Sequence, residues 1–275
     1  MTQKQTSKSA PSAGAFRLLA GAGLVLASCG TTGSIHGGSP SAWSQGAAPT
    51  GFMVAEAPSQ GASPADLGGT WTFGRCTERL LEVLTGEGFA KPNPRPMFPN
   101  PPGLLRVEPH SEGLRERIWW GSGSNATAVW AAKLGMNLQS STLKDDESGK
   151  PFHIQQAEQI ALYRQAWEDA GHEREPRVSV SRSIFALTDE RDWHYFGRDR
   201  RSSDQVGNID AKTRAIFGRS YAGAPDELAA KLAEDEAIAA ADTLLLTVPN
   251  QLGVDYNAHV IDSILKHVAP QLGWR

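Results

Sequence analysis

A glycine-rich turn between a predicted strand and a predicted helix is the segment whose residue types best suit ligand binding. It reads Gly121-Ser122-Gly123-Ser124-Asn125. Its two glycines allow a sharp bend and a close approach of the backbone to a ligand. Ser124 or Asn125 would cap the following helix, whose free N–H groups and dipole favour an anion. The turn therefore predicts a phosphate site, although the same pattern also occurs where a strand simply connects to a helix.

Several polar side chains elsewhere could serve a bound ligand. His153 and His194 could donate hydrogen bonds to a substrate, or they could be structural histidines. Arg182 lies within a predicted strand, where a buried arginine needs a partner, either a phosphate or carboxylate of a ligand or a structural salt bridge. Arg219 and Ser220 precede a predicted helix and could contribute to phosphate binding.

The elements that would position these residues alternate between strands and helices. The residue patterns predict strands at 117–121, 136–141, 177–187 and 242–248, and helices at 76–85, 126–133, 154–170, 189–196, 225–240 and 258–272. The near-continuous apolar run at 242–248 suits a parallel sheet that is covered on both faces. The alternation predicts an α/β fold, either a barrel or an open parallel sheet.

In such folds the loops that follow the strands carry the chemistry. These loops are predicted at 121–125, 140–153, 188–207 and 249–256. Asn250 and Gln251 follow the last strand and could hydrogen-bond to a substrate, whereas Trp119 and Trp120 are expected in the core.

The composition limits the classes of partner. The chain has 275 residues, of which 40% are hydrophobic and 21% charged, as in ordinary soluble globular proteins. A net charge of -3 gives no basic surface, so nucleic acid is not an expected partner, whereas a small-molecule substrate is. The two cysteines, Cys29 and Cys76, do not have the spacing of metal ligands, and no metal is predicted.

Residues 1–73 differ in composition from residues 74–275. They are rich in Gly, Ser, Ala and Pro and are expected to form a disordered leader before a single domain. Within the leader, residues 16–29 hold an apolar run after basic residues and end in Leu26-Ala27-Ser28-Cys29, which resembles a bacterial lipoprotein cleavage box. The chain is therefore predicted to be cytoplasmic or, if Cys29 is lipidated, anchored to a membrane.

Three segments of the chain resemble the bacterial luciferase-like family of flavin- and deazaflavin-dependent oxidoreductases. They are RIWWGSGSNATAVWAAKLGMNLQSS, EPRVSVSRSIFAL and GAPDELAAKLAEDEAIAAADTLLLTVP, and the resemblance covers about residues 76–275. It implies an α/β fold of the (β/α)8 TIM-barrel type. It also implies binding of FMN, or alternatively of the deazaflavin coenzyme F-420, at the carboxyl ends of the strands. Such enzymes transfer hydride or activate oxygen on a small organic substrate, and many are monooxygenases.

The resemblance also places the cofactor phosphate at residues 121–125. The flavin would carry the redox chemistry, so no catalytic side chain is required, and His153 and His194 are the only candidates. A barrel of this type has eight strands and needs about 250 residues. Only four strands are predicted, so much of the N-terminal half of the barrel is expected to be lacking. Open sheet edges would then favour a homo-oligomer. The alternative is a non-catalytic truncated barrel or a membrane-anchored lipoprotein module.

Overall fold

The computed structural model describes residues 17–18, 25–27, 73–95, 97–100, 102–208 and 214–274. The chain forms two compact units. The first comprises Met1–Cys29 together with Glu116–Arg275, and the second comprises Gly30–Arg115. The leader-and-domain division at residue 73 stays a prediction.

A parallel sheet of six strands forms the centre of the first unit. Its order is β1-β11-β6-β4-β3-β2. The strands are β1 (Arg17–Leu18), β2 (Val25–Ala27), β3 (Trp119–Ser122), β4 (Asn137–Ser140), β6 (Val178–Arg182) and β11 (Thr243–Leu246). Within the described residues the sheet is open, with β1 and β2 at its two edges. The α/β fold with parallel strands is confirmed.

The register of the parallel strands brings residues from different βα units to one edge of the sheet. Ser122 of β3 pairs with Ser140 of β4, and Ser140 pairs with Val180 of β6. Arg182 at the end of β6 pairs with Leu246 at the end of β11. Because ligands bind beyond the carboxyl ends of parallel strands, this edge is where a site is expected.

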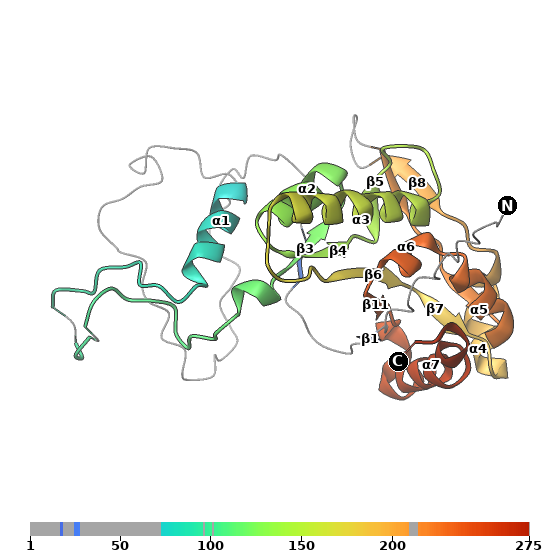
Figure 1. The fold of residues 1–275 in the computed structure, drawn as a ribbon. Coiled ribbons are helices and arrows are strands. Elements are labelled where there is room, and N and C mark those ends of the chain that lie inside the picture. Colours follow the sequence, from blue (N-terminus) through green and yellow to red (C-terminus); the bar gives the residue numbers. More distant parts are fainter. Residues whose placement is uncertain are drawn as a thin grey trace, which may run out of the picture. The chain divides into compact units, whose positions relative to one another are not determined.

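Helices α2 (Asn125–Lys133), α3 (Phe152–Asp169) and α6 (Glu236–Ala240) pack in succession, α2 against α3 and α3 against α6. Figure 1 shows α2 and α3 side by side along the sheet. Helix α7 (Gly253–His267) packs beside β7 (Ile184–Ala186), and α5 (Pro225–Ala233) packs beside β10 (Tyr221–Gly223). The core consists of buried apolar side chains, among them Leu138, Ile160, Tyr163, Val178, Val180, Leu228, Leu244 and Ile264.

The predicted strand at 177–187 is divided at Ser183. Its second part, β7 (Ile184–Ala186), leaves the six-stranded sheet and pairs in parallel with β10 (Tyr221–Gly223). The helix predicted at 225–240 is also divided, because the Asp235 carboxylate accepts the N–H groups of Ala237 and Ile238 and so begins a new helix.

Besides β10, two sets of strands were not predicted. The segments β5 (Leu143–Asp145), β8 (Gln205–Asn208) and β9 (Arg214–Phe217) form an antiparallel sheet, although the sequence predicted loops for β5 and β8 and no element for β9. The sequence also predicted no strand before residue 117, whereas β1 and β2 pair with β11 and β3. All five strands have two to four residues, too short for a periodic pattern. Pairing with strands distant in sequence stabilises β1, β2, β5 and β9, whereas β8 pairs with the nearby β9.

The second unit contains α1 (Phe73–Val83), which corresponds to the helix predicted at 76–85. Beyond it, Ala90 and Leu105 form a single antiparallel bridge. The described residues between them form no helix or strand, as suits a segment rich in proline.

None of the helices in the described part of the chain is long and apolar enough to cross a membrane. Cys29, the predicted lipidation site, lies outside the described residues.

Candidate functional site

The glycine-rich turn connects β3 to α2, as the sequence predicted, but it is shorter than predicted, because Gly121 and Ser122 belong to β3 and Asn125 begins α2. Ser124 is the N-cap of α2: its backbone is extended, and its hydroxyl accepts the N–H of Thr127 at 3.3 Å. The Ser122 hydroxyl donates to the Ser124 carbonyl at 2.8 Å, which tightens the turn. Helix α2 therefore begins at the carboxyl end of a parallel strand, with its first N–H groups at the edge where ligands bind in such folds.

A carboxylate of the chain itself lies at the start of α2. The Asn125 N–H lies 3.1 Å from one oxygen of Glu147 and 3.3 Å from the other. Glu147 also forms an ion pair with Lys144. The Lys144 side chain is only 1% exposed, whereas that of Glu147 is 32% exposed. The helix start therefore holds a buried cation and an oxyanion that reaches the surface.

The segment around Glu147 is fixed from both sides. The Asp145 N–H donates to the Gly123 carbonyl at 2.8 Å, which ties β5 to the turn. The Glu147 N–H donates to the Gln155 side chain of α3 at 3.2 Å. The Gln155 amide also donates to Asp146 at 2.7 Å and lowers the pKa of that carboxyl below its usual value, against the opposing effect of burial.

Buried glutamines of α3 face the ends of the strands. Gln159 accepts the Ser140 hydroxyl at 2.7 Å and donates to the Ser124 carbonyl at 2.9 Å. Gln156 donates to the Ser141 carbonyl at 3.0 Å. Within the described part of the chain, Gln156 Oε1 and Asn125 Oδ1 are buried acceptors without a hydrogen-bond donor. The site thus has unmatched acceptors as well as an anion position.

Arg182, predicted to meet a phosphate or carboxylate of a ligand, is paired within the protein. Its guanidinium donates two hydrogen bonds to Asp235, at 2.8 and 2.9 Å, and both side chains are buried. The Tyr221 hydroxyl donates to the same carboxylate at 2.7 Å. Burial alone would raise the pKa of Asp235, but Arg182 lowers it below its usual value, while burial and Asp235 raise the pKa of Tyr221 to about 12. For Arg182, this geometry favours the structural salt bridge over a contact with a ligand.

The two candidate histidines lie in different surroundings. His153 is half-buried in the first turn of α3, where its Nδ1 accepts the Glu236 N–H at 3.3 Å. His194 is exposed on α4 (Glu190–Phe196), with its ring 5.3 Å from that of Tyr195. The described hydrogen bonds of the glycine-rich turn include neither histidine, so their catalytic role stays a prediction.

The remaining candidates also lie apart from the turn. The Arg219 guanidinium stacks on the Tyr221 ring at 4.9 Å, and the Ser220 N–H donates to Ser202 at 3.1 Å. Asn250 begins a short 3-10 helix (Asn250–Leu252), and Gln251 beside it is exposed.

Trp120, as predicted, is buried in the core at 2% exposure. The half-buried Trp119 ring has the Arg177 guanidinium 4.9 Å above it.

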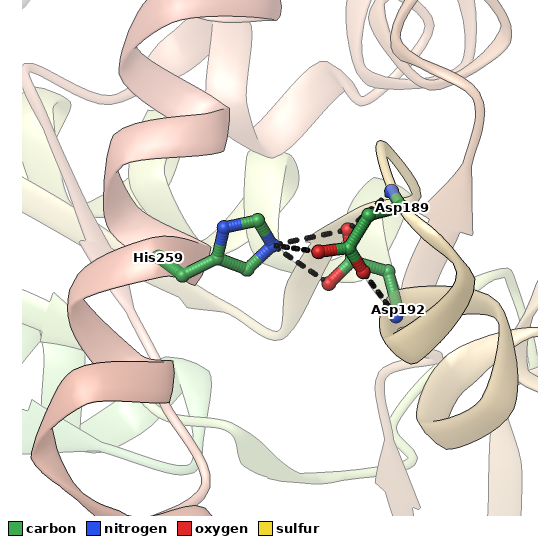
Figure 2. A group of neighbouring side chains, drawn as sticks. All are labelled: Asp189, Asp192 and His259. Atoms are coloured by element: carbon green, nitrogen blue, oxygen red, sulfur yellow. Dashed lines mark hydrogen bonds and ion pairs between the residues drawn. The ribbon is translucent and has the colours of Figure 1, made fainter.

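A second polar cluster, which the sequence reasoning missed, joins α4 to α7 (Figure 2). Asp189 is the N-cap of α4, and its carboxylate accepts the N–H of Asp192 at 3.0 Å. His259 of α7 points its Nε2 at both aspartates and lies 2.9 Å from an Asp192 oxygen. The Asp-x-x-Asp spacing before a predicted helix is the signal that could have revealed this capping box.

This cluster has the residue types of a metal site, two aspartates and a histidine. Their possible ligand atoms lie within 4.8 Å of one another, close enough to share one ion. The Asp192 oxygens are, however, already used. They accept hydrogen bonds from the Thr188 N–H at 2.9 Å, the Tyr256 hydroxyl at 2.6 Å and His259. Burial alone would raise the pKa of Asp192, but the hydrogen bonds from the Tyr256 hydroxyl and from the Thr188 and Asp189 N–H groups lower it below its usual value. The cluster is therefore best explained as a link between helices.

Comparisons with known proteins give limited guidance. No protein-family model matches the chain. No curated protein matches it either. Among solved structures it is similar to that of monooxygenase RslO1 from Streptomyces bottropensis, with 15% sequence identity and a TM-score of 0.43. The similarity covers 70% of this chain and 59% of the RslO1 chain. A likeness this distant assigns neither family nor activity.

Proposed function

We propose that the chain is a luciferase-like oxidoreductase, with strands and helices arranged as part of a (β/α)8 barrel, that binds FMN by its phosphate at the start of α2. The observation that carries this proposal is the contact between the Asn125 N–H and the two Glu147 oxygens. It supports an affinity of this helix start for an oxyanion. The position at the carboxyl end of β3 agrees with the edge where barrels and open α/β sheets bind phosphates.

Four features of the turn fit a ligand that carries a phosphate group and hydroxyls. Ser124 and Asn125 begin the helix, and the buried Lys144 supplies a positive charge. Gly123 allows close packing, because a side chain there would bring its Cβ to 3.3 Å from the Leu143 carbonyl. The unmatched acceptor Asn125 Oδ1 could accept a hydrogen bond from a hydroxyl of the ligand. Bound flavin would supply the electron transfer, and the chain would hold and orient it.

Binding of FMN to the purified full chain tests the proposal. We expect quenching of flavin fluorescence at micromolar FMN and weaker binding of riboflavin, which lacks the phosphate. Gly123→Asp should abolish FMN binding, because it adds a negative charge and a crowded side chain at the turn. Gly207→Asp is the matched control, since a side chain at that glycine meets no atom within 4 Å. Absence of binding by both FMN and the deazaflavin at micromolar concentration would refute the proposal.

A non-catalytic protein is the second candidate, and the same contact favours it. If the Glu147 carboxylate permanently fills the helix start, the turn is only a structural connection. This candidate predicts that neither cofactor binds and that Glu147→Gln and Gly123→Asp change stability alone.

A further inference from the structure

We propose that Glu147 occupies the phosphate position of the site and is exchanged for the phosphate when a ligand binds, with Lys144 as the counter-cation of both. This inference rests on the proposed function and adds its selectivity: the site would take a phosphate monoester of a polyol and reject the same compound without its phosphate.

The buried charge of Lys144 carries the first step. Its side chain is 1% exposed and its ammonium pairs with Glu147. A buried ammonium without a counter-ion is strongly destabilising, so some anion has to remain beside it. A neutral ligand that displaced Glu147 would leave the charge unpaired, whereas a phosphate would replace one anion with another. The exchange therefore selects anionic ligands.

The route of exchange is open to solvent. The Glu147 side chain is 32% exposed and belongs to the loop between β5 and α3. Its backbone is held by the hydrogen bond from its N–H to Gln155. A rotation of the Glu147 side chain toward water would free the Asn125 N–H without opening the core or moving Lys144.

The unmatched acceptors define the rest of the ligand. Gln156 is fully buried at 0% exposure, and its Oε1 has no donor among the described residues. Its amide lies beside the turn, because it donates to the Ser141 carbonyl while the Ser141 N–H donates to the Ser122 carbonyl. Asn125 Oδ1 is a second unmatched acceptor at the helix start. A carboxylate cannot donate to either oxygen, whereas polyol hydroxyls can.

The test compares Glu147→Gln with Glu158→Gln in the full chain. Both substitutions remove one negative charge from an ion pair with a lysine, but the Glu158 pair with Lys150 lies on the surface. Calorimetric titrations with FMN, riboflavin and inorganic phosphate provide the readout. We expect Glu147→Gln to tighten FMN binding about tenfold, because a competing charge beside the phosphate is removed. Riboflavin binding should be unchanged, and Glu158→Gln should match the wild type for all three compounds.

Thermal melting gives a second readout that does not depend on flavin. Inorganic phosphate should raise the melting temperature of Glu147→Gln more than that of wild type or Glu158→Gln, because it restores an anion beside Lys144. The double variant Glu147→Gln/Lys144→Gln removes both charges and should lose the preference for FMN over riboflavin.

The outcomes separate this inference from the proposed function. If Glu147→Gln changes the binding of inorganic phosphate while neither flavin binds, the exchange is supported and the redox proposal fails. If FMN binds wild type and Glu147→Gln equally, the redox proposal survives and the exchange is refuted. Equal behaviour of Glu147→Gln and Glu158→Gln toward both FMN and inorganic phosphate also refutes it.

Discussion

Replacing Asp235 with alanine should strongly destabilise the first unit, because it leaves the Arg182 guanidinium buried without its partner. Arg182 is 3% exposed and Asp235 is 1% exposed. Two hydrogen bonds join them, at 2.8 and 2.9 Å, and the Tyr221 hydroxyl donates to the same carboxylate. Breaking a buried ion pair from one side costs about 3–5 kcal/mol of unfolding free energy. In a unit of this size that corresponds to a fall of about 6–20 °C in melting temperature.

Urea unfolding followed by tryptophan fluorescence, together with thermal melting, measures this loss. Glu158→Ala is the control, since its exposed pair with Lys150 should contribute at most about 1 kcal/mol. Adding Arg182→Met to Asp235→Ala should recover part of the stability, because no charge then remains buried alone. The reasoning is refuted if Asp235→Ala melts at the same temperature as Glu158→Ala.

Three further predictions concern the helix ends and the second cluster. Because the folded pKa of Asp192 is lowered from the ordinary 3.8, its stabilisation should be present above that value and lost as the pH falls through the lowered pKa. Urea midpoints measured between about pH 5 and pH 3 should therefore fall more steeply for wild type than for Asp192→Asn. Ser124→Ala should cost about 1 kcal/mol in urea unfolding, since the cap of α2 is lost, and an unchanged midpoint would contradict the capping role. Adding Mg²⁺ or Zn²⁺ should leave the melting temperature unchanged, because hydrogen bonds already occupy the Asp192 oxygens, and a metal-dependent rise that Asp189→Ala removes would show a metal site.

The unit from β3 through α2 to β4 could be predicted closely because its signals are local. An apolar strand, a serine cap and helix-forming residues all lie within residues 119–140. The division of the strand at Ser183 could not be predicted, since apolar residues lie on both sides of the polar Ser181–Ser183 and only the pairing with β10 separates the two parts. The antiparallel sheet likewise depends on the pairing of β5 with β9, which lies far along the chain.

The candidate site shows the same limit. The pattern at 121–125 predicted an anion at the start of α2, and Glu147 supplies one from the chain itself. Nothing in the polar segment 141–152 marks Glu147 or Lys144, because both reach the turn through tertiary contacts, among them the hydrogen bond from Asp145 to Gly123 and the pairing of β5 with β9. Arg182 was recognised as a side chain that needs an anion, but Asp235 lies 53 residues away along the chain. Sequence spacing cannot reveal such a partner.

The break at Ser183 has a mechanical consequence. The carbonyl of Ser183 accepts the Tyr221 N–H at 2.8 Å, and the carbonyl of the preceding Arg182 accepts the Thr247 N–H at 2.9 Å. Adjacent peptide groups of one continuous segment thus accept hydrogen bonds from β10 of one sheet and from the residue that follows β11 of the other. Loosening either sheet displaces the common segment and strains the other, so the amide protons of Tyr221 and Thr247 should exchange with solvent through the same opening event.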